Sequence, residues 1–237
     1  MLARWTLVIG ILTVASLLLG PLLSGIRVLS PLLGFALASA GGALGIFGLL
    51  VGIVAAARGE VAAALSGLVI CGVVASLSLS FVLWARRFPP INDITTDTTQ
   101  PPEFIRALSL TPNHGRDMSY PGESFARRQR AAYPDLPPLL LPLPPAEAFL
   151  FVEAVARTMP RWQLTSVEQD RMTLEGVAET PLFRFLDDFV IQVRAADGGS
   201  VVHMRSRSRE GRGDLGVNAR RIQIFLSDVA GRSSTSR

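Results

Sequence analysis

The distribution of charge constrains this chain more than any other feature of its sequence. The first 84 residues contain four charged side chains, namely Arg4, Arg27, Arg58 and Glu60. Residues 85–237 contain 20 arginines and 18 acidic residues. A soluble domain usually has about a quarter of its residues charged. The chain therefore joins an apolar segment to an ordinary polar domain, which excludes a simple soluble enzyme, a secreted disulfide scaffold and a disordered protein.

The apolar segment contains three stretches long enough to cross a bilayer, which takes about 20 residues as a helix. They cover about residues 5–23, 32–57 and 61–84. Each is predicted to be helical, because backbone polar groups in lipid must be satisfied within the segment. We expect the first stretch to be a retained helix and not a cleaved signal, since no small-residue cleavage site with a polar flank follows it. Residues 1–87 are thus predicted to form a three-helix transmembrane anchor in the lipid bilayer.

Small residues follow one side of the second span, with four glycines spaced four, three and four apart: Gly41, Gly45, Gly48 and Gly52. Such a stripe lets helix backbones approach closely. It predicts packing within the three-helix bundle, with an oligomer interface as the alternative. Cys71, the only cysteine, lies in a similar seam of the third span and is interpreted as a small packing residue.

The polar part is predicted to be an α+β domain over residues 88–229, followed by a disordered tail over 230–237. A Pro-rich, extended N-terminal arm is expected over 88–145, and a helix is expected to start at Pro145. Four strands are predicted, at about 162–168, 171–179, 185–196 and 200–209. A last helix is expected over 216–229, with Asp214 as its N-cap. The predicted fold is an antiparallel sheet of about four strands with two helices against one face.

The two long strands can be paired through a hairpin signal, Asp197-Gly198-Gly199. A two-residue turn there places apolar residues of both strands on one face, which is expected to be the core. The opposite face then carries a ladder of arginines beside an acid and a histidine. The polar residues on that face are Asp188, Gln192, Arg194, His203, Arg205, Arg207 and Arg209.

Three ordered motifs in the polar part resemble the family of unknown function DUF1499. They are Ile91–Asp97 with Pro101–Phe104, then Phe185–Ile191, then Met204–Arg209 with Gly213–Ile222. The resemblance spans about residues 89–229. One departure is His203, which stands where the family usually has an acid, so that acid's role does not carry over. Structural roles are expected for the polar motif residues Asp93, Asp97, Asp187, Asp214 and Asn218.

The resemblance implies a location but no chemistry. Members of the family often carry an N-terminal signal or anchor, and plastid members look lumenal. This implies a bacterial inner-membrane protein with a periplasmic C-terminal domain. The balance of arginines around the spans favours the opposite orientation, but by one residue only.

Several hypotheses for function remain open from the sequence. The first is a non-enzymatic envelope module that binds an anionic small molecule, a lipid head group or an envelope protein. Its candidate ligand-binding residues are Arg205, Arg207, Arg209, Asp188, His203, Arg220 and Arg221. The second is an enzyme on an anionic substrate, with Asp188 as base and Arg205 and Arg207 as clamp. The third is a structural subunit of a membrane complex.

Other functions have little support in the sequence. The net charge of +2 over residues 85–237 is too small for a dedicated nucleic-acid binder. Two histidines without an acidic cluster at metal spacing predict no metal site, and we expect no cofactor. Asp187 and Asp188 are adjacent in a strand, so they point to opposite faces and cannot share a proton. We therefore expect no catalytic residue, and a cross-strand ion pair of Asp188 with Arg207 or Arg209.

Overall fold

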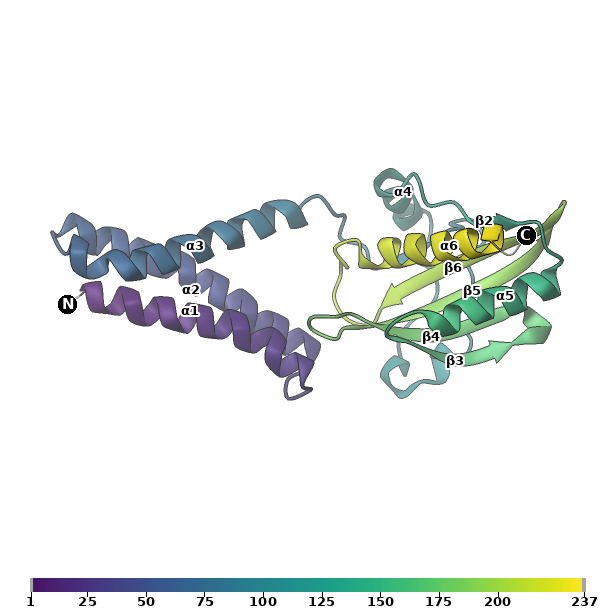
Figure 1. The fold of residues 1–237 in the computed structure, drawn as a ribbon, viewed down its shortest axis with the longest axis horizontal. Coiled ribbons are helices and arrows are strands. Elements are labelled where there is room, and N and C mark those ends of the chain that lie inside the picture. The colour runs from purple at the N-terminus through teal and green to yellow at the C-terminus, as the bar shows by residue number, and fades with distance from the viewer. Residues whose placement is uncertain (1, 236–237) are drawn as a thin grey trace. The chain divides into compact units, whose positions relative to one another are not determined.

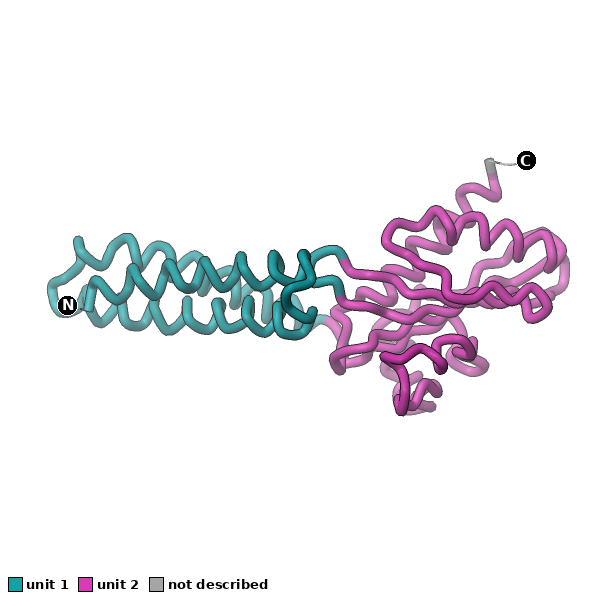
Figure 2. The backbone as a smooth tube through the Cα atoms, turned by 90° about the horizontal axis from the view of Figure 1, so that it is seen from below, with its two compact units in different colours: residues 1–87, 181–184 teal, residues 88–180, 185–237 magenta. Residues whose placement is uncertain are grey.

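The computed structural model describes residues 2–235 and divides into two units (Figure 2). The first unit comprises residues 1–87 with 181–184, and the second comprises residues 88–180 with 185–237. The first contains three long apolar helices, and the second is a mixed domain built on an antiparallel sheet (Figure 1). The predicted fold class is confirmed.

The three helices are α1 (Leu2–Gly25), α2 (Pro31–Ala57) and α3 (Val61–Ala85). Each is long and apolar enough to cross a membrane. Helix α2 begins where Pro31 removes a backbone donor that a first helical turn leaves unsatisfied anyway. The Ser30 side chain accepts a hydrogen bond from the Leu33 N–H there and caps the helix.

The glycine stripe of α2 packs inside this bundle. A Cβ built on Gly45 would lie 2.8 Å from Val74 of α3 and 3.2 Å from Thr13 of α1. One built on Gly48 would lie 2.5 Å from the Cys71 sulfur. These separations are far below a normal carbon contact, so glycine is required for the helices to approach. The predicted packing role of the glycines and of Cys71 is confirmed.

The second unit contains six strands and three α-helices among its described residues. The strands are β1 (Asp93–Thr95), β2 (Leu139–Leu141), β3 (Trp162–Glu168), β4 (Thr173–Glu179), β5 (Leu186–Ala196) and β6 (Gly199–Ser208). The helices are α4 (Glu123–Ala132), α5 (Pro145–Thr158) and α6 (Val217–Thr235). Three short 3-10 turns are η1 (Ala107–Ser109), η2 (Thr111–Asn113) and η3 (Gln169–Arg171).

All strand pairs are antiparallel, in the order β1-β6-β5-β4-β3, and β2 pairs with β6 beside β1. The β5–β6 hairpin has the predicted register, with Val193 opposite Val202 and Asp188 opposite Arg207. One face of the sheet forms the core with α5 and α6 packed on it (Figure 1). Phe149 of α5, Phe225 of α6 and Phe189 of β5 are fully buried in this core.

The structure corrects three predictions about the domain's less regular parts. Six strands form where about four were predicted, because β1 and β2 come from the arm and are too short to show a period of two. The arm is not extended throughout, since residues 123–132 form helix α4, in which Glu123 pairs with Arg130 at 2.6 Å. The segment expected to be a disordered tail is helical as far as Thr235. Asp228 and Arg232 form an ion pair at i,i+4 in this part of α6, which stabilises the helix. Residues 236 and 237 of that prediction lie outside the described residues.

Candidate functional site

The arm packs on the polar face of the sheet and buries much of it, leaving a cleft over one part. Across β4, β5 and β6 its side chains form rows: Thr173–Gln192–His203, then Glu175–Val190–Arg205, then Val177–Asp188–Arg207. A second apolar cluster joins the arm to the middle row. In this cluster Phe104, Ala107 and Met118 of the arm pack on Val190.

Arg205, in the middle row, is a buried structural cation. Its side chain is 2% exposed, and its Nε and Nη2 each donate to Asp93 at 2.8 Å. The guanidinium also donates to the carbonyls of Pro102 and Met118, and it lies over the Phe104 ring at 4.8 Å. Arg205 therefore fixes the arm to the sheet. The prediction that it clamps a ligand on an open face is wrong.

The carboxylate of Asp188 is also bound on both oxygens by neighbouring side chains. Arg209 donates to both of its oxygens, at 2.7–3.2 Å, and the side-chain amide of Asn113 donates a further hydrogen bond at 3.0 Å. The carboxylate is 1% exposed. The predicted cross-strand ion pair is confirmed with Arg209 as the partner. The hypothesis that Asp188 is a catalytic base is wrong, since that role requires a free carboxylate within reach of a substrate.

Arg207 lies between these two pairs. Its Nη1 donates to the carbonyl of Ser119, and its Nε lies 3.7 Å from Asp93. Burial holds the pKa of Arg207 below its usual range. The side chain is largely covered, so Arg207 also belongs to the contact between arm and sheet.

Four further candidates, Asp187, Asn218, Arg220 and Arg221, lie on the core side of the sheet or on the helix that covers it. Asp187 forms an ion pair with Arg221 of α6. Asn218 bonds the hydroxyls of Ser206 and Ser208. Arg220 is exposed on α6. Neither Arg220 nor Arg221 therefore joins the arginine ladder, because α6 covers the opposite face.

Asp214 acts at the start of α6, as predicted. Its two oxygens accept hydrogen bonds from the backbone N–H groups of Gly216 and Asn218. Asp214 thereby satisfies backbone N–H groups that have no partner within the first turn of the helix.

Glu175 was not among the predicted residues, although it holds the arm in place. Its carboxylate is 2% exposed and accepts hydrogen bonds from the backbone N–H groups of Ile105, Arg106 and Ala107 at 2.7–2.8 Å. The alternation in β4 places Glu175 on the face opposite Leu174, which is the signal that sequence reasoning could have used.

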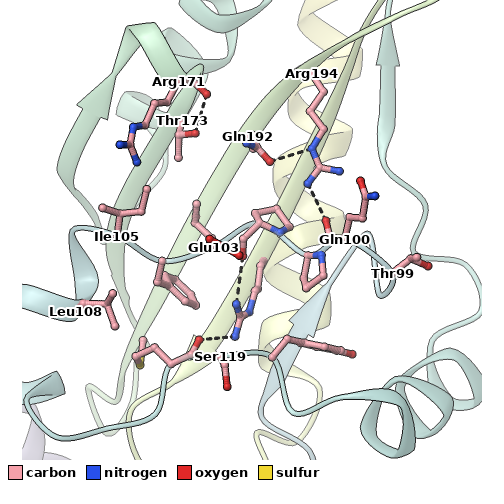
Figure 3. Close-up of a pocket in the computed structure, with 17 residues that line it drawn as sticks. Thr99, Gln100, Glu103, Ile105, Leu108, Ser119, Arg171, Thr173, Gln192 and Arg194 are labelled. Carbon is pink, nitrogen blue, oxygen red and sulfur yellow. Dashed lines mark hydrogen bonds between the residues drawn. The ribbon is translucent and has the colours of Figure 1, made fainter.

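Beside this covered region, a cleft of about 900 Å³ lies between the arm and strands β4, β5 and β6 (Figure 3). Arg171, Thr173, Gln192 and Arg194 lie along one end of the cleft. Leu108 lies toward its other end. The size is within the range of small-molecule sites, and the lining combines arginines and one exposed acid, Glu103, with apolar side chains.

The cationic end is organised by Arg194. Its guanidinium donates to Asp97 at 2.9 Å, to the Gln100 carbonyl at 2.7 Å and to Gln192 at 2.9 Å. Asp97 also accepts the backbone N–H groups of Thr99 and Gln100, so it fixes the turn at the rim of the cleft. The structural role expected for Asp97 is therefore to pair with Arg194 and to hold this turn in place.

His203 lies behind this end of the cleft. It is 7% exposed, and its Nδ1 lies 3.9 Å from Asp97 without a hydrogen-bond partner among residues 2–235. Burial and the nearby Arg194 lower the pKa of His203, while Asp97 partly offsets them. The imidazole is thus held neutral and does not reach the cleft as a ligand-binding group.

Arg171 also lines the cleft, although it was not predicted as a site residue. The β4–β5 pairing places Thr173 opposite Gln192, and the hydrogen bond from Val193 N–H to the Met172 carbonyl extends it. Arg171 precedes this pairing as the last residue of η3. Arg171 is exposed, and no described carboxylate lies within ion-pair distance of it. The residues described here also contain no group of three metal-ligating side chains.

The comparisons with known proteins agree with the motifs. No curated protein and no solved structure matches the chain. The family described as "Protein of unknown function (DUF1499)" matches residues 93–229, which is more than half of the chain and nearly all of the mixed domain. The match contains β1, the cleft and α6 up to Val229. The chain therefore belongs to the DUF1499 family.

Proposed function

We propose that this protein is a membrane-anchored, non-enzymatic binding module whose ligand carries an anionic group. The anion binds in the cleft between Arg171 and Arg194. The observation that carries the proposal is that two arginines line the cleft while Asp97 pairs with only one of them, Arg194.

The charge at this end favours an anion. Two cations that line one cleft repel each other. Asp97 neutralises Arg194, but Arg171 has no described carboxylate beside it. An anion between the two guanidinium groups would accept charge-assisted hydrogen bonds from both. Gln192 and Thr173 add polar groups between the two arginines.

The state of the two buried acidic groups near the cleft, Asp93 and Glu175, favours binding over catalysis. Asp93 is bound by Arg205, and Glu175 is bound by three backbone N–H groups. Each carboxylate is buried and serves the contact between arm and sheet. A general base needs a pKa near the working pH and access to the proton it removes.

The location is part of the same proposal. The three candidate membrane-spanning helices indicate a membrane location. We further propose that the membrane is the bacterial inner membrane and that the domain is periplasmic. A reporter fused after Arg237 that is active only in the periplasm tests this placement. Periplasmic activity supports it, and activity in a cytoplasmic reporter contradicts it.

Anion binding is tested with the full chain in phosphatidylcholine nanodiscs. Methyl phosphate is titrated by calorimetry, with empty nanodiscs as the blank. We expect Arg171→Gln to weaken binding at least tenfold, since a hydrogen bond to a charged group contributes about 1.5–3 kcal/mol.

The matched control is Arg220→Gln, which removes an exposed arginine from α6 on the other side of the sheet. This variant should bind methyl phosphate like the wild type. Equal affinity of the wild type and Arg171→Gln, or no binding by either, contradicts the proposal.

A further inference from the structure

The cleft has an apolar part that a small anion would leave unused. Ile105 and Leu108 line it and are 44% and 50% exposed. Their neighbours Phe104 and Ala107 are buried on the sheet. Exposing two large aliphatic side chains side by side is unfavourable in water. A ligand that covers them would remove this penalty.

The exposure of these side chains is built into the fold. Glu175 binds the backbone N–H groups of Ile105, Arg106 and Ala107. From the other end of the turn, the Asn113 side chain donates to the Ala107 carbonyl at 2.9 Å. The backbone is therefore held from both sides while Ile105 and Leu108 stay outside, which preorganises an apolar surface.

The apolar part lies at a defined distance from the cationic end. Glu175, which binds this turn, pairs with Val190 in β5. Arg194 lies four residues further along the same strand, which is about 13 Å at strand geometry. Figure 3 shows Arg171 and Arg194 on either side of Thr173 and Gln192, with Leu108 far from Arg194. A ligand that contacts both ends is elongated, with an anionic and an apolar end.

We infer that the ligand is a single-chain amphiphile with an anionic head group, such as a phosphate or carboxylate. The head group lies between Arg171 and Arg194, and the aliphatic chain covers Ile105 and Leu108. This inference rests on the proposed function and adds the class of ligand. The membrane-spanning helices support it, since a bilayer is a source of such molecules.

The test compares three probes on the full chain in phosphatidylcholine nanodiscs: hexyl phosphate, methyl phosphate and hexanol. Calorimetry with empty nanodiscs as the blank removes the heat of partition into lipid. We expect hexyl phosphate to bind at least tenfold more tightly than methyl phosphate, since burying two methylenes is enough for that factor. Hexanol, which lacks the anion, should bind at least tenfold more weakly than hexyl phosphate.

A substitution at Leu108 tests whether the apolar part of the cleft causes the preference for hexyl phosphate over methyl phosphate. Leu108→Ser should reduce the ratio of the two phosphate affinities at least threefold while leaving methyl phosphate binding unchanged. Leu150→Ser is the matched control, because Leu150 is 53% exposed on α5, away from the cleft. It should keep the wild-type ratio. An unchanged ratio in Leu108→Ser overturns the inference.

The outcomes separate the two proposals. Equal binding of hexyl and methyl phosphate by the wild type overturns the amphiphile and leaves the anion site standing. No binding of either phosphate overturns both. Adding lysophosphatidic acid, a single-chain membrane lipid with a phosphate head group, to the nanodiscs identifies the source of the amphiphile. If the added lipid competes with hexyl phosphate, the amphiphile is a bilayer lipid. If it does not compete, the amphiphile comes from the aqueous phase. Either result retains the anionic head group.

Discussion

Replacing Arg205 with methionine tests whether the arginine ladder is structural. The change keeps an unbranched apolar side chain and removes the charge and the donors of the guanidinium. It leaves Asp93 as a buried carboxylate without its main partner, which typically costs 3–5 kcal/mol. The carbonyls of Pro102 and Met118 lose a donor as well. The sheet domain should therefore lose a large part of a stability that is commonly about 5–15 kcal/mol.

Hydrogen exchange of the β6 backbone, read by mass spectrometry on the full chain, reports this loss within the domain. A loss of 3–5 kcal/mol accelerates exchange by about a hundredfold to several thousandfold. Asp93→Asn combined with Arg205→Met should recover part of the protection, because the unpaired charge is gone. Arg130→Met is the matched control, since it breaks an exposed pair with Glu123 and should change exchange less than about tenfold. Exchange in Arg205→Met within threefold of the wild type would refute this reasoning.

Three further predictions concern the arm, His203 and the helical bundle. Glu175→Gln should accelerate exchange of the Ala107 amide about tenfold, because an amide group cannot accept all three N–H groups; an unchanged rate contradicts this. The pKa of His203 is lowered in the folded domain. As the pH falls through about 6.5, the unfolded state therefore binds a proton on this imidazole before the folded state does. The domain should lose stability in that window, and chemical denaturation of His203→Gln should show a smaller loss; equal losses would remove the effect. Gly45→Leu should lower the thermal stability of the bundle in detergent, whereas Gly72→Leu, whose Cβ would meet its nearest neighbour at 3.8 Å, should not; equal stability of both variants contradicts the packing role.

The sequence predicted those features that depend on local periodicity. The alternation along β5 and β6 gave their register and placed Asp188 and Arg209 on one face, because the side-chain period in a strand is two. Asp214 was predicted as a cap because its position before an apolar repeat has a local signature.

The features that the sequence did not predict depend on contacts between distant segments. Asp93 and Arg205 lie 112 positions apart, and no local pattern shows that the arm returns to cover the sheet. Arg171 lies in the η3 turn before β4, where no periodicity marks it as part of a site. The ladder was therefore interpreted as an open binding face, whereas the exposed arginine of the cleft is Arg171.

The most direct test of the central claim is to identify what the protein carries when it is purified. The wild type, Arg171→Glu and the control Arg220→Glu are isolated from the same membranes, extracted with organic solvent and analysed by negative-ion mass spectrometry. The account predicts an anionic molecule that accompanies the wild type and Arg220→Glu in near-stoichiometric amount and is lost from Arg171→Glu. Equal anion content in all three proteins would contradict it.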